Sequence, residues 1–200
     1  MCLKLFLWDL GNDYIQCKGL YTINGTVVYK MAQINQKWDK VLELFFEYPN
    51  KSFSVREISK KARIPSSSVH RYLQILKKEN LITAENKAII TLYFKFKKTF
   101  YIIDKIYNIG LLDFINRELN PSLVIVFGSV RKGEYEKESD IDIFIESSID
   151  KKLNLEDYER KIGHKIQIFV EKDIKKIQPN LFKNVINGIK IEGYLDISLK

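Results

Sequence analysis

Two aspartates, Asp140 and Asp142, interrupt the apolar segment DIDIFIE, and they are the side chains best suited to chemistry in this sequence. In a strand they alternate with Ile141, so both carboxylates project from the same face. Paired carboxylates on one face are suitable ligands for a hard cation such as Mg²⁺. The alternative is that both acids form the wet side of a half-exposed strand, and the pair alone does not decide between the two interpretations.

Gly128-Ser129 precedes this pair by ten residues and follows the apolar run VIVF. A glycine lets the backbone approach a phosphate closely, and a serine at the start of a turn or helix offers its N–H and hydroxyl to that phosphate. Arg131 and Lys132 would add positive charge. Phosphoryl or nucleotidyl transfer needs cations that neutralise the triphosphate and activate the attacking oxygen. The alternative is a simple turn followed by a solvated, charged loop.

The whole pattern, GS-x10-DxD, resembles the signature of the minimal nucleotidyltransferases of the polymerase-β superfamily, and the segment NGIKIEG resembles the end of that domain. The resemblance covers about residues 120–197, within a domain expected at residues 120–200. It implies a mixed-sheet domain that transfers a nucleoside monophosphate from a triphosphate to a protein, nucleic acid or small molecule. It also implies Mg²⁺ as cofactor, Asp140 and Asp142 as catalytic and metal-binding residues, and a nucleotide held by Gly128, Ser129, Arg131 and Lys132. Such proteins often pair with a small helical protein, which is a further expected partner and acceptor.

One position departs from the family pattern. Active members usually carry a third carboxylate on the later strand, and here the strand KIQIFVE has Gln167 at that position. An amide is a weaker metal ligand and cannot serve as a base for the incoming hydroxyl. Glu171 shares the face but lies four residues along, about 13 Å away at ~3.3 Å per residue. The sequence therefore predicts the fold and nucleotide binding. The alternative to an active enzyme is a transcriptional regulator or antitoxin-like protein whose nucleotidyltransferase domain is catalytically weak or inactive.

The elements that must position these residues follow a strand, loop, strand, helix, strand, helix, strand order. SLVIVFGS is a continuous apolar run typical of a buried strand. In DIDIFIE, the three isoleucines point to one face and Asp140, Asp142 and Phe144 to the other. LEDYERKIG is expected to form a helix, KIQIFVEK a strand, and the last segment a helix that ends near Asn187-Gly188 before a short strand.

The preceding region has helical periodicity. Trp38, Val41, Leu42 and Phe45 predict one helix, and Ser54 with Glu57 predicts a capping box at the start of a second. A serine of RIPSSS is expected to cap a third, with Val69, Tyr72, Leu73 and Leu76 on its buried side. LITAENKAIITLYF then predicts two short strands around Glu85-Asn86-Lys87. Residues 31–98 therefore resemble a winged helix-turn-helix domain, and the overall fold class is α+β.

In winged-helix proteins the third helix enters the DNA major groove and the wing contacts the backbone. The resemblance thus implies double-stranded DNA as a partner, and we expect the following residues to contact it: Ser67, Ser68, His70, Arg71, Gln74, Lys77, Lys78 and Lys87. Charge agrees, because residues 31–98 hold 14 Lys/Arg against 6 Asp/Glu, whereas residues 121–200 hold 14 of each. A localised positive charge favours a polyanionic partner. The alternatives are a solvated lysine-rich surface and a protein-docking winged helix.

Two segments remain. Residues 99–119 are expected to form a connector, one helix or a pair broken at Gly110, with Phe100, Ile103 and Tyr107 and then Leu111, Phe114 and Ile115 as core. Residues 1–30 are expected to be an extension, with a hairpin signalled by Asn-Gly.

The composition places the chain among globular proteins. Its 200 residues allow one large or two small domains, and no apolar run approaches the ~20 residues of a membrane helix. Cys2 and Cys17 suggest neither a disulfide framework nor a metal site, and Leu3 to Leu10 lacks the features of a signal peptide. We therefore expect a cytoplasmic protein without a membrane partner. Analogy with winged-helix regulators, which are commonly dimers, suggests a homodimer.

Overall fold

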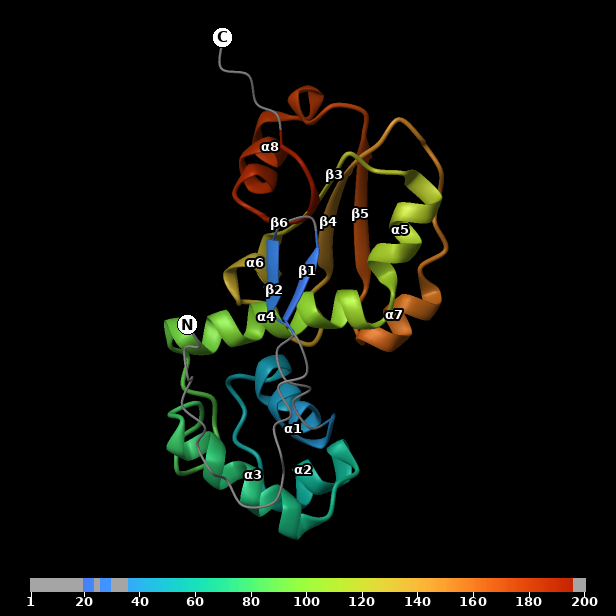
Figure 1. Ribbon diagram of the computed structural model, residues 1–200. Coiled ribbons are helices and arrows are strands. Elements are labelled where there is room, and N and C mark those ends of the chain that lie inside the picture. The colour runs from blue at the N-terminus through green and yellow to red at the C-terminus, as the bar shows by residue number, and fades with distance from the viewer. Residues whose placement is uncertain (1–19, 24–25, 30–35, 196–200) are drawn as a thin grey trace, which may run out of the picture.

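The computed structural model describes residues 20–23, 26–29 and 36–195, which form a helical region and a mixed-sheet domain joined by a long helix (Figure 1). The helical region contains α1 (Gln36–Glu47), α2 (Val55–Ala62) and α3 (Ser66–Lys78). α4 (Leu92–Asn108) runs between the two parts, and α5 (Leu111–Leu119) leads into the sheet domain. The sheet domain contains β3 (Leu123–Phe127), α6 (Gly128–Lys132), β4 (Ile141–Glu146), α7 (Glu156–Ile162), β5 (Ile166–Glu171), the 3₁₀ helix η1 (Ile174–Lys176), α8 (Pro179–Ile186) and β6 (Ile189–Gly193).

The sheet has the strand order β5-β4-β3-β6. β4 pairs with β5 in parallel, and β3 pairs antiparallel with both β4 and β6. The four strands and two longer helices expected between residues 120 and 195 are confirmed, and the structure adds the short helices α6 and η1. Together they give an α+β fold with a mixed sheet. The register sets Asp142 opposite Phe127 on one side and Gln167 on the other.

The two faces of the sheet have different coverings, and the alternation in β4 assigns each residue to one of them. Ile141, Ile143 and Ile145 join the large core shared with the helical region, and α5 and α7 cover this face. Phe144 lies on the opposite face with Phe127 in a second core, which includes Val185 of α8. Asp142 alternates onto this second face, on the side of α8 (Figure 1).

The helical region begins its second helix as expected. The Ser54 N–H donates to Glu57 Oε2 at 2.9 Å and the Glu57 N–H donates to Ser54 Oγ at 3.2 Å, which is a capping box. The expected buried face of α3 is confirmed: Val69, Tyr72, Leu73 and Leu76 are all buried. The expected serine cap on α3 is wrong, because Pro65 is the N-cap and no side chain caps this helix.

The expected wing differs most from the structure. Only an isolated bridge between Ile82 and Ala88 flanks the turn, and the segment expected as the second strand begins α4. Thr91 caps this helix by accepting from the Phe94 N–H at 3.1 Å. Phe94 is buried against Phe46, with ring centroids 5.2 Å apart, and this packing outweighs the strand preference of its aromatic neighbours. Between Gln36 and Thr91 the structure thus has three helices and a turn, without a two-stranded wing.

α4 also begins before the connector expected from residue 99. The break at Gly110 is present, where φ is +74°. Leu111 and Ile115 are buried as expected. Phe100 and Tyr107, expected as core, are 40% and 49% exposed, because Ile102 and Ile106 occupy the buried face instead. β1 (Leu20–Ile23) and β2 (Thr26–Tyr29) pair antiparallel, which agrees with the expected hairpin.

The other expectations for residues 1–30, including those for Cys2, Cys17 and Leu3 to Leu10, concern positions outside the described residues. Within the described part of the chain, no helix is both long and apolar enough to cross a membrane.

Candidate nucleotide and metal site

A cavity of about 380 Å³ opens where β3 ends and α6 begins. It brings together residues from three segments that are distant in sequence. These are Phe127, Gly128, Ser129, Arg131, Lys132 and Glu134 around α6, Asp142 from β4, and Lys183, Asn184 and Asn187 from α8. The four residues expected at the nucleotide and one of the two expected metal ligands therefore line one cavity. Asp140 is not among the lining residues, but the charge of its carboxylate acts on Asp142 and helps to raise the pKa of that residue.

Gly128 forms the floor of this cavity and is in a conformation that favours glycine. Its φ is +69°, in the left-handed region, where a β-carbon is strained. A β-carbon added here would lie 2.0 Å from Asp142 Oδ2. The chain therefore needs a residue without a side chain at this position so that the carboxylate can lie against the backbone where α6 begins.

The two aspartates repel each other electrostatically. Burial, and then the nearby charge of Asp140, raise the pKa of Asp142 above its usual value. Within the described residues, no donor is hydrogen-bonded to the Asp142 carboxylate, and no cluster of three or more His, Cys, Asp or Glu residues surrounds it. A cation between the two carboxylates would remove their repulsion, so this donor set fits a hard divalent ion such as Mg²⁺.

Gln167 lies beside this pair. It is the register partner of Asp142 on the parallel strand β5, so the two side chains are on the same face. Glu171 is instead the partner of Glu146, at the other end of the strands. The expectation that Gln167 occupies the third position, and that Glu171 is too distant to replace it, agrees with this register.

The positive charge around the cavity comes from two sides. Arg131 and Lys132 are exposed on α6, and Lys183 lies across the cavity on α8. Glu134 carries the opposite charge, but Lys95 Nζ on α4 lies 2.7 Å from its Oε1. The cationic side chains can therefore attract a polyphosphate even though an acid lies at the rim.

Sequence reasoning missed the wall formed by α8. Lys183 and Asn184 of α8 and its C-cap residue Asn187 line the cavity, and Lys183 and Asn187 share a face because they are four residues apart. The Asn187 side chain also donates to the Lys183 carbonyl at 2.7 Å. Their only sequence signal is the polar face of the helix, which is indistinguishable from an ordinary solvated surface.

The DNA contacts expected on α3 lie far from this cavity in the helical region (Figure 1). Ser67, His70, Arg71, Gln74 and Lys78 are exposed along one face of the helix, and Ser68 and Lys77 flank that face with partial exposure. Lys77 Nζ donates to the Ala84 carbonyl at 2.9 Å, which fixes it against the following turn. Lys87 is exposed in that turn.

Comparison with family models matched residues 109–195 to the nucleotidyltransferase domain. Comparisons with curated proteins and with solved structures found no match. The matched range begins at the end of α4 and includes the whole sheet, the Gly128-Ser129 turn and both aspartates. The family typically uses Mg²⁺ and a nucleoside triphosphate. Residues 109–195 of this chain are therefore a nucleotidyltransferase domain.

Proposed function

We propose that the chain binds a metal–nucleoside triphosphate in the cavity beside α6 and transfers a nucleoside monophosphate to an acceptor. The observation that carries this proposal is the convergence of Gly128, Ser129 and Asp142 on one cavity with cations on two sides. Asp140 and Asp142 would hold Mg²⁺. Gly128 and Ser129 would contact the phosphates, and Arg131, Lys132 and Lys183 would neutralise them.

In this reaction an acceptor oxygen forms a bond to the α-phosphorus, the bond from that phosphorus to the β-phosphate oxygen breaks, and pyrophosphate leaves. The bound metal ion would supply charge neutralisation for the triphosphate. The acceptor proton passes to solvent, because Gln167 cannot take it. The residues of the cavity therefore bind and orient the triphosphate, and slow turnover is expected.

The test uses each of the four nucleoside triphosphates, labelled on the α-phosphate, with Mg²⁺ and a mixture of protein and RNA acceptors. We expect label in a covalent product, and none with the double variant Asp140→Ala and Asp142→Ala. Binding of the Mg²⁺–nucleotide without label in any acceptor would instead support a nucleotide-sensing regulator. Absence of both binding and transfer would overturn the proposal.

A second function is favoured by the helical region, which we propose contacts double-stranded DNA through the exposed face of α3. The polar side chains of this face and the surplus of 14 Lys/Arg over 6 Asp/Glu in residues 31–98 support it. Without a two-stranded wing, the contact would depend on α3 and Lys87. A duplex shift that weakens with salt and with Arg71→Ala is expected, and no shift at low salt would contradict it.

A further inference from the structure

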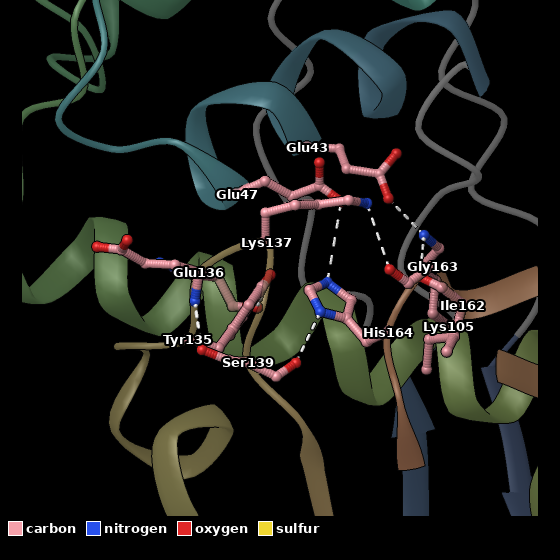
Figure 2. Close-up of polar contacts among 11 residues, drawn as sticks. Glu43, Glu47, Lys105, Tyr135, Glu136, Lys137, Ser139, Ile162, Gly163 and His164 are labelled. Atoms are coloured by element: carbon pink, nitrogen blue, oxygen red, sulfur yellow. Dashed lines mark hydrogen bonds and ion pairs between the residues drawn. The ribbon is translucent and has the colours of Figure 1, made fainter. Parts of the chain in front are cut away.

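The last residue of α1 is bound to the sheet domain at two points (Figure 2). Lys137 Nζ donates to Glu47 Oε1 at 2.8 Å, and the Lys137 backbone N–H donates to the Glu47 carbonyl at 3.1 Å. Glu47 is only 7% exposed, so its charge is removed from water and depends on this partner. The two contacts together fix Lys137 relative to the helical region.

Lys137 belongs to the loop that leads from α6 into β4, three residues before Asp140. The same loop contacts the turn before β5: Lys137 Nζ reaches the Gly163 carbonyl at 3.3 Å, and the His164 ring bonds the Ser139 carbonyl at 3.0 Å through Nδ1. His164 Nε2 lies 3.9 Å from Glu47 Oε1. The segments that precede β4 and β5 therefore meet at Glu47, as Figure 2 shows.

The protonation states of His164 and Lys137 beside Glu47 follow from their burial and contacts. His164 is 6% exposed, and burial lowers its pKa below the usual value, so the ring is neutral at pH 7. Because the Ser139 carbonyl can only accept, Nδ1 carries the proton and donates. Lys137 is therefore the cation that compensates Glu47. Burial acts to lower the pKa of Lys137, but the hydrogen bond to Glu47 and the charge of Glu47 outweigh it, so the pKa of this lysine is raised.

We propose that Glu47 is a positioning residue for the candidate site, through which the helical region sets the affinity for the metal–nucleotide. β4 and β5 begin directly after the two segments that Glu47 joins, and Asp142 and Gln167 are register partners at the start of those strands. A shift of the segment that precedes β4 changes the position of the Asp142 carboxylate relative to Gly128, whose backbone lies against that carboxylate. This inference rests on the proposed function.

The chain offers a matched control on the same helix. Glu43 Oε1 accepts from Lys105 Nζ at 2.5 Å, and Lys105 Nζ also donates to the Ile162 carbonyl at 3.0 Å. This pair joins α1, α4 and the end of α7, but it does not contact the loop that leads to Asp140. A loss of stability without a change of the site is therefore expected when Glu43 loses its charge.

The experiment measures the Kd of the full chain for each Mg²⁺–nucleoside triphosphate, and the midpoint of thermal unfolding, for the wild type, Glu47→Gln, Glu43→Gln and Lys137→Met. We expect both glutamate variants to unfold at lower temperature. Only Glu47→Gln and Lys137→Met should weaken nucleotide binding, by about tenfold, and the variant with both changes should bind no more weakly than either alone. Lys137→Met keeps the test decisive if Glu47→Gln does not fold.

The outcomes separate the two proposals. If the wild type binds no Mg²⁺–nucleotide, the proposed function fails and this inference fails with it. If the wild type binds and the affinities of Glu47→Gln and Lys137→Met are unchanged, or fall no more than that of Glu43→Gln, only the positioning role is overturned. An effect confined to Glu47→Gln and Lys137→Met supports it, because a general loss of stability would act on all three variants.

Discussion

The strand β4 carries two acids four residues apart on one face, and the two have opposite surroundings. Glu146 Oε1 accepts from Ser122 Oγ at 2.8 Å, and Glu146 Oε2 accepts from the Ile174 N–H at 3.0 Å. Asp142 lines the cavity. Burial, and then the like charge of Asp140, raise the pKa of Asp142. Glu146 is therefore held by hydrogen bonds within the protein, whereas the negative charge of Asp142 is available to a bound cation.

The difference teaches how to separate a structural carboxylate from a ligand-binding one. Both acids follow the same alternation, and both have a partner on β5, Gln167 for Asp142 and Glu171 for Glu146. The two acids differ in their hydrogen-bond donors. Glu146 accepts from the N–H of Ile174, the first residue of η1, and from the hydroxyl of Ser122, directly before β3. At the other end of the strand, the Asp142 carboxylate lies against the backbone of Gly128 and is repelled by the charge of Asp140.

The largest effect is expected from Gly128→Ala, which would displace the Asp142 carboxylate and leave Glu146 unchanged. The new β-carbon would meet Asp142 Oδ2 at 2.0 Å, and the left-handed backbone adds about 1–2 kcal/mol of strain. We expect Mg²⁺–nucleotide binding to weaken by more than about tenfold, with a fall in the unfolding midpoint. Isothermal titration calorimetry and thermal unfolding measure the two effects.

Gly110→Ala is the matched control for this change. Gly110 has a similar φ of +74°, but nothing lies within 4 Å of an added β-carbon. It should therefore lose stability by about 1 kcal/mol and keep its nucleotide affinity. Equal losses of affinity in the two variants would mean that backbone strain, and not the contact with Asp142, explains the effect of Gly128→Ala.

The second prediction compares the two acids directly by removing each. Glu146→Ala leaves the Ile174 N–H without its acceptor and removes the shorter of the two hydrogen bonds of the Ser122 hydroxyl, which should lower the free energy of unfolding by about 1–3 kcal/mol. Asp142→Ala removes a repelled charge and should leave stability unchanged or slightly higher without metal. Urea unfolding in the presence of a chelator measures both, and a larger loss for Asp142→Ala would reverse the assignment of roles.

Much of the region around these acids could be predicted from the sequence, because the signals are local. The alternation in DIDIFIE assigned Asp142 to the face of Phe144, and the Ser54 and Glu57 spacing predicted the capping box that the structure contains. The strand order along the chain followed from short apolar runs bounded by turn residues. The position of Gln167 beside Asp142 followed from the family pattern.

The features that could not be predicted depend on contacts between distant segments. Lys137 and Glu47 are 90 residues apart, and Lys183 of α8 reaches the cavity only because the sheet brings α8 to the α6 end of β3. The start of α4 was expected as a strand because Leu92 to Phe94 is aromatic and apolar. Its helical state is set by a threonine cap and by the burial of Phe94 between the two parts of the molecule.

A third prediction sharpens the comparison by restoring the missing acid. Gln167→Glu adds a like charge directly opposite Asp142, so stability in the presence of a chelator should fall by up to about 1 kcal/mol. Mg²⁺ should then raise the unfolding midpoint more than in the wild type, because it binds the folded state more tightly. Glu171→Gln, at the structural end of β5, should leave the response to Mg²⁺ unchanged.

The smallest effect concerns an acid that also has a raised pKa but lies away from the cavity. Burial, and then the charges of Asp104 and Glu43, raise the pKa of Asp39 on α1 to about 7, from 3.8. Between these values the folded protein holds a proton that the unfolded chain has lost, so this acid lowers stability as the pH rises from about 4 to about 7. Partial exposure screens the charge and leaves about 1 kcal/mol.

Asp39→Asn should therefore reduce the fall in unfolding midpoint between pH 5 and pH 8, whereas Asp157→Asn, an exposed acid of α7, should not. The effect of Mg²⁺ distinguishes Asp39 from Asp142 of the candidate site. A raised pKa at Asp142 comes with a cavity and a second carboxylate that a cation can bridge, whereas Asp39 lies at the packed contact of α1 with α4. We expect the contribution of Asp39 to the pH dependence to be the same with and without Mg²⁺, and a metal-sensitive contribution would mean that burial alone does not distinguish the two acids.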